Sequence, residues 1–342
     1  MSKGKPPVSI VVRTKDRPKL LARALRSIAA QAHRPIETVL VNDGGCDLNI
    51  GELEGILGDV SLRYVGLEKS SGRAHAANVG IDHAKGKYIG FLDDDDELFP
   101  AHVQTIVAVL ERGGNKVVYT DTEMVFQELK PETGETVDIS KTVFSKDFSY
   151  DDLLIANYIP FNSLLFDSAV LKAAGGIDEG FELYEDWDLL IRIAKQHPFR
   201  HVATITTRYY QWDRAQQLNQ RDAAHMRAVH VAVINKHLAE ISAATVFSLW
   251  RSSHDRDVLL AEKNRVISRL EDALRSKEEE LRSKVAAISS LQDTLRSMEA
   301  TLGWQALERF RRSREALLPE GSTRRRLYDS GVRSIKGIFK KV

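Results

Sequence analysis

The sequence predicts an α/β domain with a mainly parallel sheet, followed by a long helical extension. Short apolar runs alternate with amphipathic stretches from Val8 to about Tyr210, and the strand signals stop past about Arg221. Leucine and isoleucine then recur every seven residues from Leu260. With 342 residues, of which 43% are hydrophobic, the chain is long enough for one large domain and a smaller part.

Strands and helices are expected to alternate through the first domain. The runs that we expect to form strands are VSIVVRT, ETVLVND, LRYVGL, KYIGFLD and KVVYTD. The stretches that we expect to form helices between them are PKLLARALRSIAAQ, AANVGIDHAK and AHVQTIVAVLERG. Ligands of parallel sheets bind beyond the carboxyl ends of the strands. Asp16, Asp43 and the run from Asp93 to Asp96 each follow an expected strand, so they should gather on one rim.

Composition and charge exclude several classes of protein. A net charge of +1 excludes a globally basic nucleic-acid binder. The single cysteine, Cys46, excludes an intramolecular disulfide and a multi-cysteine zinc site, and it favours a reducing compartment. The N-terminal stretch lacks the features of a signal peptide, and no run approaches the roughly 20 apolar residues of a membrane-spanning helix. We therefore expect a cytoplasmic protein.

The C-terminal part follows a helical pattern. Over residues 221–255 the stretch HMRAVHVAVINKHLAEI predicts a helical connector. A coiled coil is expected over residues 256–302, because every heptad a position counted from Leu260 is apolar. Lysines at d positions 263, 277 and 284 interrupt the seam, which favours a weak or register-selective coil. A single solvated helix is the alternative.

Residues 303–342 form a basic, amphipathic tail. It holds 11 lysines and arginines against 4 acids, a net charge of +7, and aromatic residues such as Trp304 and Phe310 lie among the cations. This pattern suits an interfacial helix on anionic lipid. A solvated basic tail is the alternative, and nucleic acid fits less well because the first domain has no matching basic stripe.

The four aspartates from Asp93 to Asp96 require an explanation, because neighbouring like charges oppose one another's ionisation. An EF-hand loop is excluded, since the sixth residue is Leu98 and not glycine. On extended chain Asp93 and Asp95 point the same way, so the pair can hold a divalent cation and the phosphates that it carries. A solvated turn, with Asp96 capping the helix after Pro100, is the alternative.

Four segments of the first domain share a family pattern. They are VSIVVRTKDRP followed by a helix and Gln31, VLVNDGG, GRAHAANVGIDHAKGKYIGFLDDDDEL, and GGIDEGFELYEDWDLLIRIA. In order and spacing this set resembles the family 2 glycosyltransferases of the GT-A fold, over about Val8 to Tyr210. The resemblance implies a GT-A domain over residues 1–220, with a mixed, mainly parallel sheet flanked by helices. No G-x-G-x-x-G or P-loop pattern competes for the nucleotide.

The resemblance implies a donor site for a nucleotide-sugar. Asp43 in VLVNDGG would accept a hydrogen bond from the pyrimidine base, which favours a UDP- or dTDP-sugar; an Asx turn with Gly44 and Gly45 is the alternative. The family commonly has arginine before the asparagine of GRAHAANVG, whereas here Ala77 occupies that position and Arg73 is the nearest cation for the diphosphate. The residues that the resemblance assigns to the donor are Thr14, Asp16, Arg17, Asp43, Arg73 and Asp93.

The resemblance also implies a divalent metal, Mn or Mg. Asp95 matches the metal-binding aspartate, and Asp93 would reach metal or ribose. The metal would bridge the diphosphate and stabilise it as it leaves. The family often adds a histidine ligand later in the chain, where RYYQWDR has Trp212 and Asp213, so we assign no third protein ligand.

Asp186 in YEDWDLLIRIA matches the family's catalytic base, at the start of an amphipathic helix where an anion is favoured. Glu185 would support it and Trp187 would offer a stacking face for a sugar. The alternative is a set of helix-start acids with Trp187 in the core. The GGIDE segment, with Gly175, Gly176 and Asp178, would shape the donor-sugar and acceptor region, and the pair Asn162 and Ser163 would contribute there.

We therefore expect an inverting, metal-dependent glycosyltransferase of surface polysaccharide synthesis. It would move a sugar from a UDP- or dTDP-sugar to a hydroxyl of a glycan or lipid-linked acceptor. The coiled coil would join copies of the chain or a partner, and the tail would hold the enzyme at the inner face of the plasma membrane. The alternatives are a nucleotidyltransferase, which also uses paired carboxylates and metal, and a non-catalytic coiled-coil scaffold.

Overall fold

The computed structural model describes residues 5–129, 136–212 and 223–339. Contacts divide the chain into two units, Met1–Ser253 and His254–Val342. Asp213 of the RYYQWDR segment and the last two lysines of the tail lie outside the described residues.

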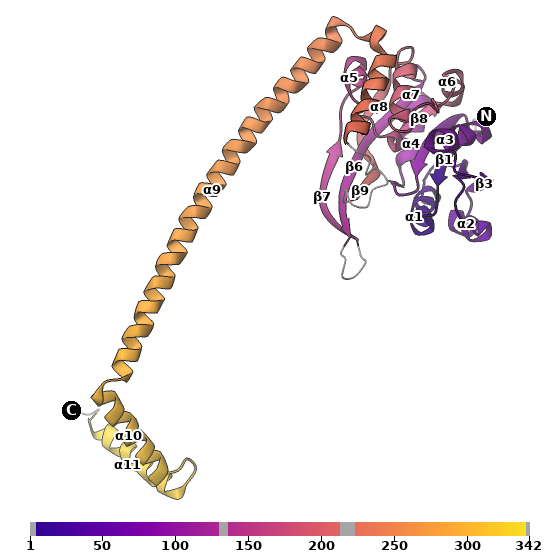
Figure 1. The fold of residues 1–342 in the computed structure, drawn as a ribbon. Helices are drawn as coiled ribbons and strands as arrows, with labels where there is room; N and C mark the ends of the chain where they lie inside the picture. Colours follow the sequence, from indigo (N-terminus) through magenta and orange to yellow (C-terminus); the bar gives the residue numbers. More distant parts are fainter. Residues whose placement is uncertain (1–4, 130–135, 213–222, 340–342) are drawn as a thin grey trace. The chain divides into compact units, whose positions relative to one another are not determined.

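The N-terminal unit is built on a mixed, mainly parallel sheet (Figure 1). The strand order is β3-β2-β1-β4-β8-β6-β9-β5, with β7 paired to β6. Strands β1 to β4 are parallel, β8 runs antiparallel to β4 and β6, and β9 is parallel to β6. The strands are β1 Val8–Thr14, β2 Ile36–Asn42, β3 Ser61–Gly66, β4 Tyr88–Asp93, β5 Glu97–Leu98, β6 Val117–Leu129, β7 Thr136–Phe144, β8 Leu164–Asp167 and β9 Arg200–Trp212.

Helices cover the sheet through two apolar clusters. Strand β1 shows why the sheet is buried on both sides: Val8, Ile10 and Val12 belong to one cluster, and Val11 to the other, as the two-residue period of a strand requires. The helices are α1 Pro18–Ala29, α2 Ile50–Leu57, α3 Arg73–His83, α4 His102–Leu110, α5 Tyr150–Ile155, α6 Ser168–Ala173, α7 Glu185–Ala194 and α8 Ala223–Lys236, with short 3-10 turns η1 Phe161–Ser163 and η2 Leu238–Glu240.

The predicted elements are confirmed for β1 to β4 and β6, and for α1, α3, α4 and α7. Helices α2, α5 and α6, strand β5 and strands β7 to β9 were not predicted. The prediction of one helix through HMRAVHVAVINKHLAEI is wrong, because α8 ends at Lys236 and a 3-10 turn follows. The chain leaves the helix at His237, whose ring bonds the buried Asp188 of α7.

The remaining helices are α9 Ala243–Glu299, α10 Leu302–Leu317 and α11 Thr323–Phe339. The first turns of α9 belong to the N-terminal unit: Thr245 donates to Asp151 at 2.5 Å, and Ser248 donates to Asp152. From Leu260 to Leu295 the predicted heptad leucines and isoleucines lie on one continuous helix and are exposed. In the part of the chain that the structure describes, no helix has both the length and the apolar character needed to cross a bilayer.

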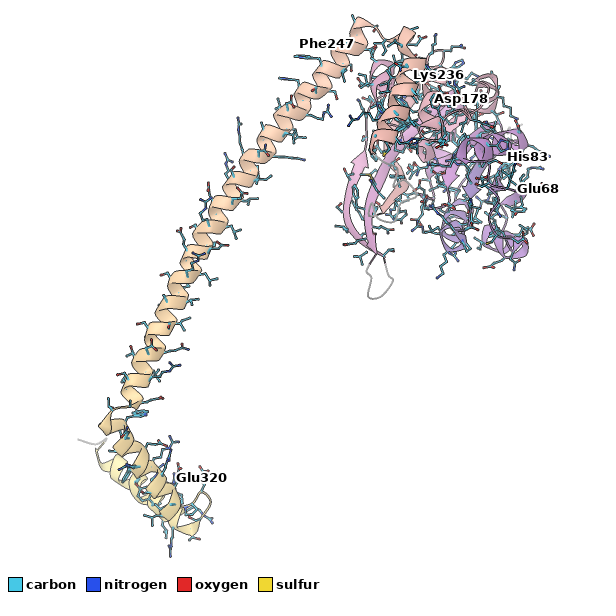
Figure 2. The ribbon with its side chains drawn as sticks, in the orientation of Figure 1. Glu68, His83, Asp178, Lys236, Phe247 and Glu320 are labelled. Carbon is cyan, nitrogen blue, oxygen red and sulfur yellow. The ribbon has the colours of Figure 1, made fainter. Side chains whose placement is uncertain are left out.

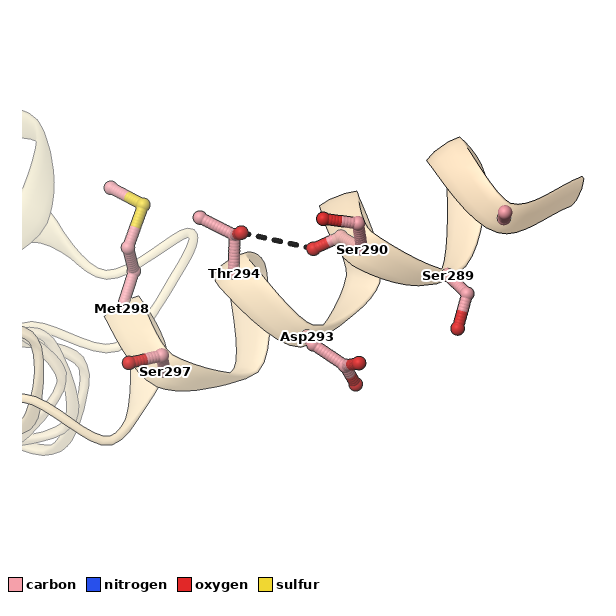
Figure 3. A pocket seen from close by; sticks show the side chains of 7 residues that line it. Ser289, Ser290, Asp293, Thr294, Ser297 and Met298 are labelled. Atoms are coloured by element: carbon pink, nitrogen blue, oxygen red, sulfur yellow. Dashed lines mark hydrogen bonds between the residues drawn. The ribbon is translucent and has the colours of Figure 1, made fainter. Parts of the chain in front are cut away.

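A hollow along α9 is lined by residues of that helix alone, among them Ser289, Asp293 and Met298 (Figure 3). The Thr294 hydroxyl there donates to the Ser290 carbonyl at 2.9 Å, a bond within the helix. One helix face encloses no ligand, so the chemistry must be sought at the rim of the sheet.

Candidate active site

The carboxyl ends of β1, β2 and β4 lie side by side, as predicted. Thr14 is in register with Asn42, and Arg13 with Asp93. Asp16 adopts a left-handed backbone with φ 56°, and its carboxylate accepts from the Cys46 amide at 2.8 Å. The loops that follow three parallel strands are therefore joined at one rim.

The aspartate run alternates between the interior and the surface. Asp94 and Asp96 are buried. Thr14 donates to Asp94 at 2.7 Å, while Asn162 at 2.9 Å and the Tyr210 amide at 3.1 Å donate to Asp96. Burial raises the pKa of Asp94 to about 6. Two of the four carboxylates thus hold β1, η1 and β9 to the loop after β4.

Asp93, one of the outward pair, is held by two arginines. Arg13 Nη2 lies 2.5 Å and Arg73 Nη2 lies 3.2 Å from its two oxygens. Burial alone would raise the pKa of Asp93, but Arg13 and Arg73 lower it to about 2. The same arginines lie 3.3 and 3.4 Å from Glu185 on α7. The guanidinium groups therefore connect the end of β4 with the start of α7.

Asp95, the other outward carboxylate, contacts a third arginine. Arg17 Nη1 lies 3.0 Å from Asp95 and 3.3 Å from Asp94. Arg23 of α1 donates to the Asp95 carbonyl at 2.5 Å. The first-loop residues Thr14 and Arg17 thus contact the aspartate run itself, and the loop's cation lies beside the carboxylate assigned to metal.

Asp186 lies in the first turn of α7, after Tyr184 in a left-handed conformation with φ 59°. Asn157 donates to Asp186 Oδ2 at 3.1 Å, and the Trp187 amide donates to Oδ1 at 2.8 Å. Burial and the neighbouring Glu185 raise the pKa of Asp186 to about 6. A carboxylate with a pKa near 6 is ionised at neutral pH and is a better proton acceptor than an ordinary aspartate.

Trp187 offers no stacking face, so that prediction is wrong. Its ring is fully buried in the core, and its Nε1 donates to the Leu153 carbonyl at 2.6 Å. The contribution of Asn162 and Ser163 to the donor-sugar and acceptor region is wrong for the same reason: both are buried, Asn162 donates to Asp96 and Ser163 donates to the Pro160 carbonyl.

Asp43 holds the loop that leads into α3. Its carboxylate accepts from the Ser71 amide at 2.6 Å, the Ser70 hydroxyl at 2.9 Å and the Gly72 amide at 3.1 Å. Gly44 has φ +67°, and a Cβ there would lie 2.3 Å from the Ser70 nitrogen. The close approach explains why the turn after β2 requires glycine.

Asn78 joins α3 to the GGIDE segment. It exchanges hydrogen bonds of 2.8 Å with the backbone N–H and C=O of Ile177. Ala77, where the family pattern has arginine, is fully buried. Arg73, one helical turn earlier on α3, provides the guanidinium at the rim instead.

A buried ionic cluster fixes α7 from behind. Asp188 accepts from Lys236 at 2.7 Å and from His237 and Arg192 at 2.8 Å each. Lys236 also lies 2.7 Å from Asp178, and Figure 2 shows these two residues close together. The cluster holds the end of α8 and the GGIDE segment against the helix that carries Asp186.

The residues at the rim fit a divalent cation. The side chains of Asp93 and Asp95 are 34% and 23% exposed, so their carboxylates, which pair with Arg13, Arg73 and Arg17, can also reach a cation. Mg is commonly held by one or two carboxylates together with substrate phosphates. Within the described residues no group of three or more His, Cys, Asp or Glu gathers as a metal site. A cation there would thus take its other ligands from the diphosphate and water.

Three residues of the site were missed from the sequence: Arg13, Arg23 and Asn157. Only Arg13 left a signal, because an arginine at the end of the buried strand VSIVVRT needs an anionic partner. Arg23 and Asn157 resemble ordinary surface residues of a helix and a loop in the sequence, and only the fold brings them to the carboxylates.

Comparison with known proteins agrees with this geometry. Residues 9–172 match the family model Glycosyl transferase family 2. YwdF of Bacillus subtilis (strain 168), described as an uncharacterized glycosyltransferase, is 29% identical over 203 residues, 59% of this chain and 73% of YwdF. WcaA of Escherichia coli (strain K12), described as a candidate colanic acid biosynthesis glycosyl transferase, is 26% identical over 210 residues, 57% of this chain and 68% of WcaA.

Among solved structures, S. aureus TarS 1–349 in complex with UDP-GlcNAc has a similar fold. The TM-score is 0.51 at 17% sequence identity, covering 71% of this chain and 75% of that chain. The predicted GT-A fold is confirmed: a mixed, mainly parallel sheet with flanking helices, followed by a long helical extension.

Proposed function

We propose that this chain, whose residues 9–172 match the model of glycosyl transferase family 2 and whose first unit has a GT-A fold, is an inverting, metal-dependent glycosyltransferase of that family. The observation that carries the proposal is the arginine bridge at the rim. Arg13 and Arg73 contact both Asp93, a donor-side carboxylate, and Glu185, the neighbour of Asp186. A carboxylate suited to proton transfer therefore lies beside a set of cations suited to a diphosphate.

In the proposed reaction Asp186 takes the proton of an acceptor hydroxyl. The hydroxyl oxygen attacks the anomeric carbon of the donor sugar from the face opposite the diphosphate. The bond between that carbon and the diphosphate oxygen breaks, and the nucleoside diphosphate leaves with the bonding electrons. Asn157, which donates to Asp186 Oδ2, holds the base so that one oxygen can face the acceptor.

The donor side would be formed by the cations and carboxylates of the rim. Arg17 and Arg73 are partly exposed and can reach phosphate oxygens, which guanidinium groups bind strongly. Asp43 would contact the base. Asp93 and Asp95 would hold Mn or Mg, which supplies positive charge to the departing diphosphate. TarS is known in complex with UDP and with UDP-GlcNAc, so uridine donors are tested first and dTDP donors second.

The acceptor would be a hydroxyl of a glycan or of a lipid-linked sugar in surface polysaccharide synthesis. The description of WcaA as a candidate colanic acid enzyme supports this class. The exposed heptad residues of α9 would join two or more copies of the chain as a coiled coil, because isolated rows of exposed leucine are costly in water.

The experiment is release of nucleoside diphosphate from a panel of UDP- and dTDP-sugars by the full chain, with a mixture of simple glycosides as acceptors. Turnover should require both a donor and an acceptor, and Asp186→Asn should reduce it about a thousandfold. The matched control is Asp138→Asn, an exposed carboxylate of β7. Equal turnover by Asp186→Asn and the natural chain would contradict the assigned base.

A further inference from the structure

On α10 and α11, large apolar side chains that the structure describes are exposed, whereas two of the arginines are partly covered. Among the described side chains the exposed fractions are 53% for Trp304, 65% for Phe310 and 71% for Leu317. Arg314 and Arg325 are partly buried, and Arg325 forms an ion pair of 3.2 Å with Asp329. Two helices that are surrounded only by water would bury the large apolar side chains and expose the arginines.

The exposed apolar residues of α10 form one face. Trp304, Leu307, Phe310 and Leu317 fall within an arc of about 140° when the helix advances about 100° per residue, and Arg311 and Arg314 lie within the same arc. All four are more than half exposed, so no described part of the chain covers this face. On α11, Leu327 is 70% exposed as well. Large apolar side chains interleaved with arginine, whose charged end can extend toward water while its stem lies along apolar surface, are typical of a helix that lies in an interface.

The positive charge around this face indicates which kind of partner it binds. Residues 303–342 carry a net charge of +7. Two of their four acids are used in pairs within α10, Arg312 with Glu308 and Arg311 with Glu315, both at 3.4 Å. A second copy of this segment would bring like charge against like charge. An anionic surface with an apolar layer beneath it matches both features.

We propose that α10 and α11 bind the surface of an anionic lipid bilayer. Trp304, Leu307, Phe310 and Leu317 enter the boundary between headgroups and acyl chains, and the arginines beside them contact lipid phosphates. The chain then belongs to the proteins that lie on a membrane without crossing it. This inference rests on the C-terminal helices alone and holds or fails whether or not the proposed glycosyl transfer is correct.

The test is co-sedimentation of the full chain with vesicles of phosphatidylcholine and with vesicles of phosphatidylcholine mixed with phosphatidylglycerol. Binding should require the anionic lipid and weaken as salt rises, because salt screens the attraction. Phe310→Ala should weaken binding about tenfold, from the apolar area that no longer enters the bilayer. The matched control is Phe247→Ala, since Phe247 of α9 (Figure 2) is 59% exposed and lies outside this segment.

A second pair of variants tests the charge. Arg309→Gln with Arg312→Gln should weaken binding to the anionic vesicles, whereas Arg265→Gln with Arg269→Gln on α9 should not. Helix content by circular dichroism shows whether each variant folds. Failure of the natural chain to bind either vesicle would overturn the proposal, as would an equal loss in Phe247→Ala and Phe310→Ala. Binding to an RNA or protein probe without binding to vesicles would also overturn it.

Discussion

Arg13 Nη2 lies 2.5 Å from Asp93 Oδ1, and the Nη1 atom of the same guanidinium lies 3.3 Å from Glu185 Oε1. Arg13 is 8% exposed and Glu185 is 3% exposed. The guanidinium is therefore a buried link between the proposed donor side and the proposed base side. Removal of one partner from a buried charge network leaves the others without compensation.

Arg13→Gln should therefore lower both stability and donor binding. We expect a loss of about 2–4 kcal/mol in the free energy of unfolding, because Asp93 and Glu185 lose a shared cation. Arg13→Lys keeps the positive charge but cannot contact both carboxylates as a guanidinium does. Its free energy of unfolding should therefore lie between those of the natural chain and Arg13→Gln. Urea unfolding measures the effect, with Arg26→Gln on the exposed side of α1 as control. Equal stability of the Arg13→Gln variant and the control would contradict the bridging role.

The loss of activity at low pH should follow the protonation of Asp186. Its pKa is raised to about 6, so the carboxylate is ionised above that value and proton acceptance is lost as the pH falls through it. The logarithm of kcat/KM should bend near pH 6. Asp186→Asn should reduce kcat about a thousandfold.

The pKa of Asp94 is also about 6, so a second variant is needed to show which carboxylate causes the loss of activity at low pH. Glu185→Gln provides this distinction. Removal of the Glu185 charge lowers the pKa of Asp186, so the loss of activity should move to lower pH. Glu52→Gln on α2 should leave the loss near pH 6. If the Glu185→Gln variant still loses activity near pH 6, the loss belongs to a group other than Asp186.

The charge of Asp188 should make the free energy of unfolding depend on pH in the acidic range. Although burial alone would raise the pKa of Asp188, the bonds from His237, Lys236 and Arg192 lower it below its usual range. A lowered folded-state pKa stabilises the fold fully above the unfolded value of about 3.9, and this stabilisation is lost as the pH falls through the folded-state pKa. Asp188→Asn should cost about 3 kcal/mol at pH 7.

The difference in unfolding free energy between the natural chain and Asp188→Asn should shrink below about pH 4. Urea titrations at several pH values measure it. Asp138→Asn on the exposed strand β7 serves as control. A difference that stays constant down to pH 3 would show that the effect is not electrostatic.

Leu274→Ser with Leu281→Ser should dissociate the chain if α9 forms a coiled coil. Both leucines are more than 60% exposed and occupy heptad a positions. Sedimentation velocity of the full chain measures the association state. Arg275→Ser with Arg282→Ser alters neighbouring positions outside the apolar row and should change nothing. A natural chain that sediments as a monomer at micromolar concentration would contradict the coiled coil.

Sequence reasoning located the first strands of the sheet and the residues directly beyond their ends. The buried strands β1, β2 and β4 are continuous apolar runs, so their ends and the aspartates beyond them were predictable. The extended chain expected through the aspartate run is wrong, because β4 ends at Asp93 and a turn follows, closed by the bond of 3.1 Å from the Asp96 amide to the Asp93 carbonyl. Asp94 and Asp96 are buried by this turn and by their hydrogen-bond partners, which the sequence did not reveal.

Later strands and long-range contacts were not predictable in this way. Strand β8 has only four residues, so its apolar run of three is too short to identify a strand, and β7 is exposed along its whole length and has no buried run to detect. The partners of Arg13 lie 80 and 172 positions away in the chain. Trp187 follows Asp186 directly, yet helical rotation turns its ring into the core.

The most direct test is a calorimetric titration of UDP into the full chain, once with Mn and once with a chelator. The same titration with Mn is made on the Asp95→Asn and Asp138→Asn variants. The account predicts binding that needs Mn, that Asp95→Asn loses and that Asp138→Asn retains. Binding that is equally tight in chelator and in Asp95→Asn would contradict a donor site built on the aspartate run.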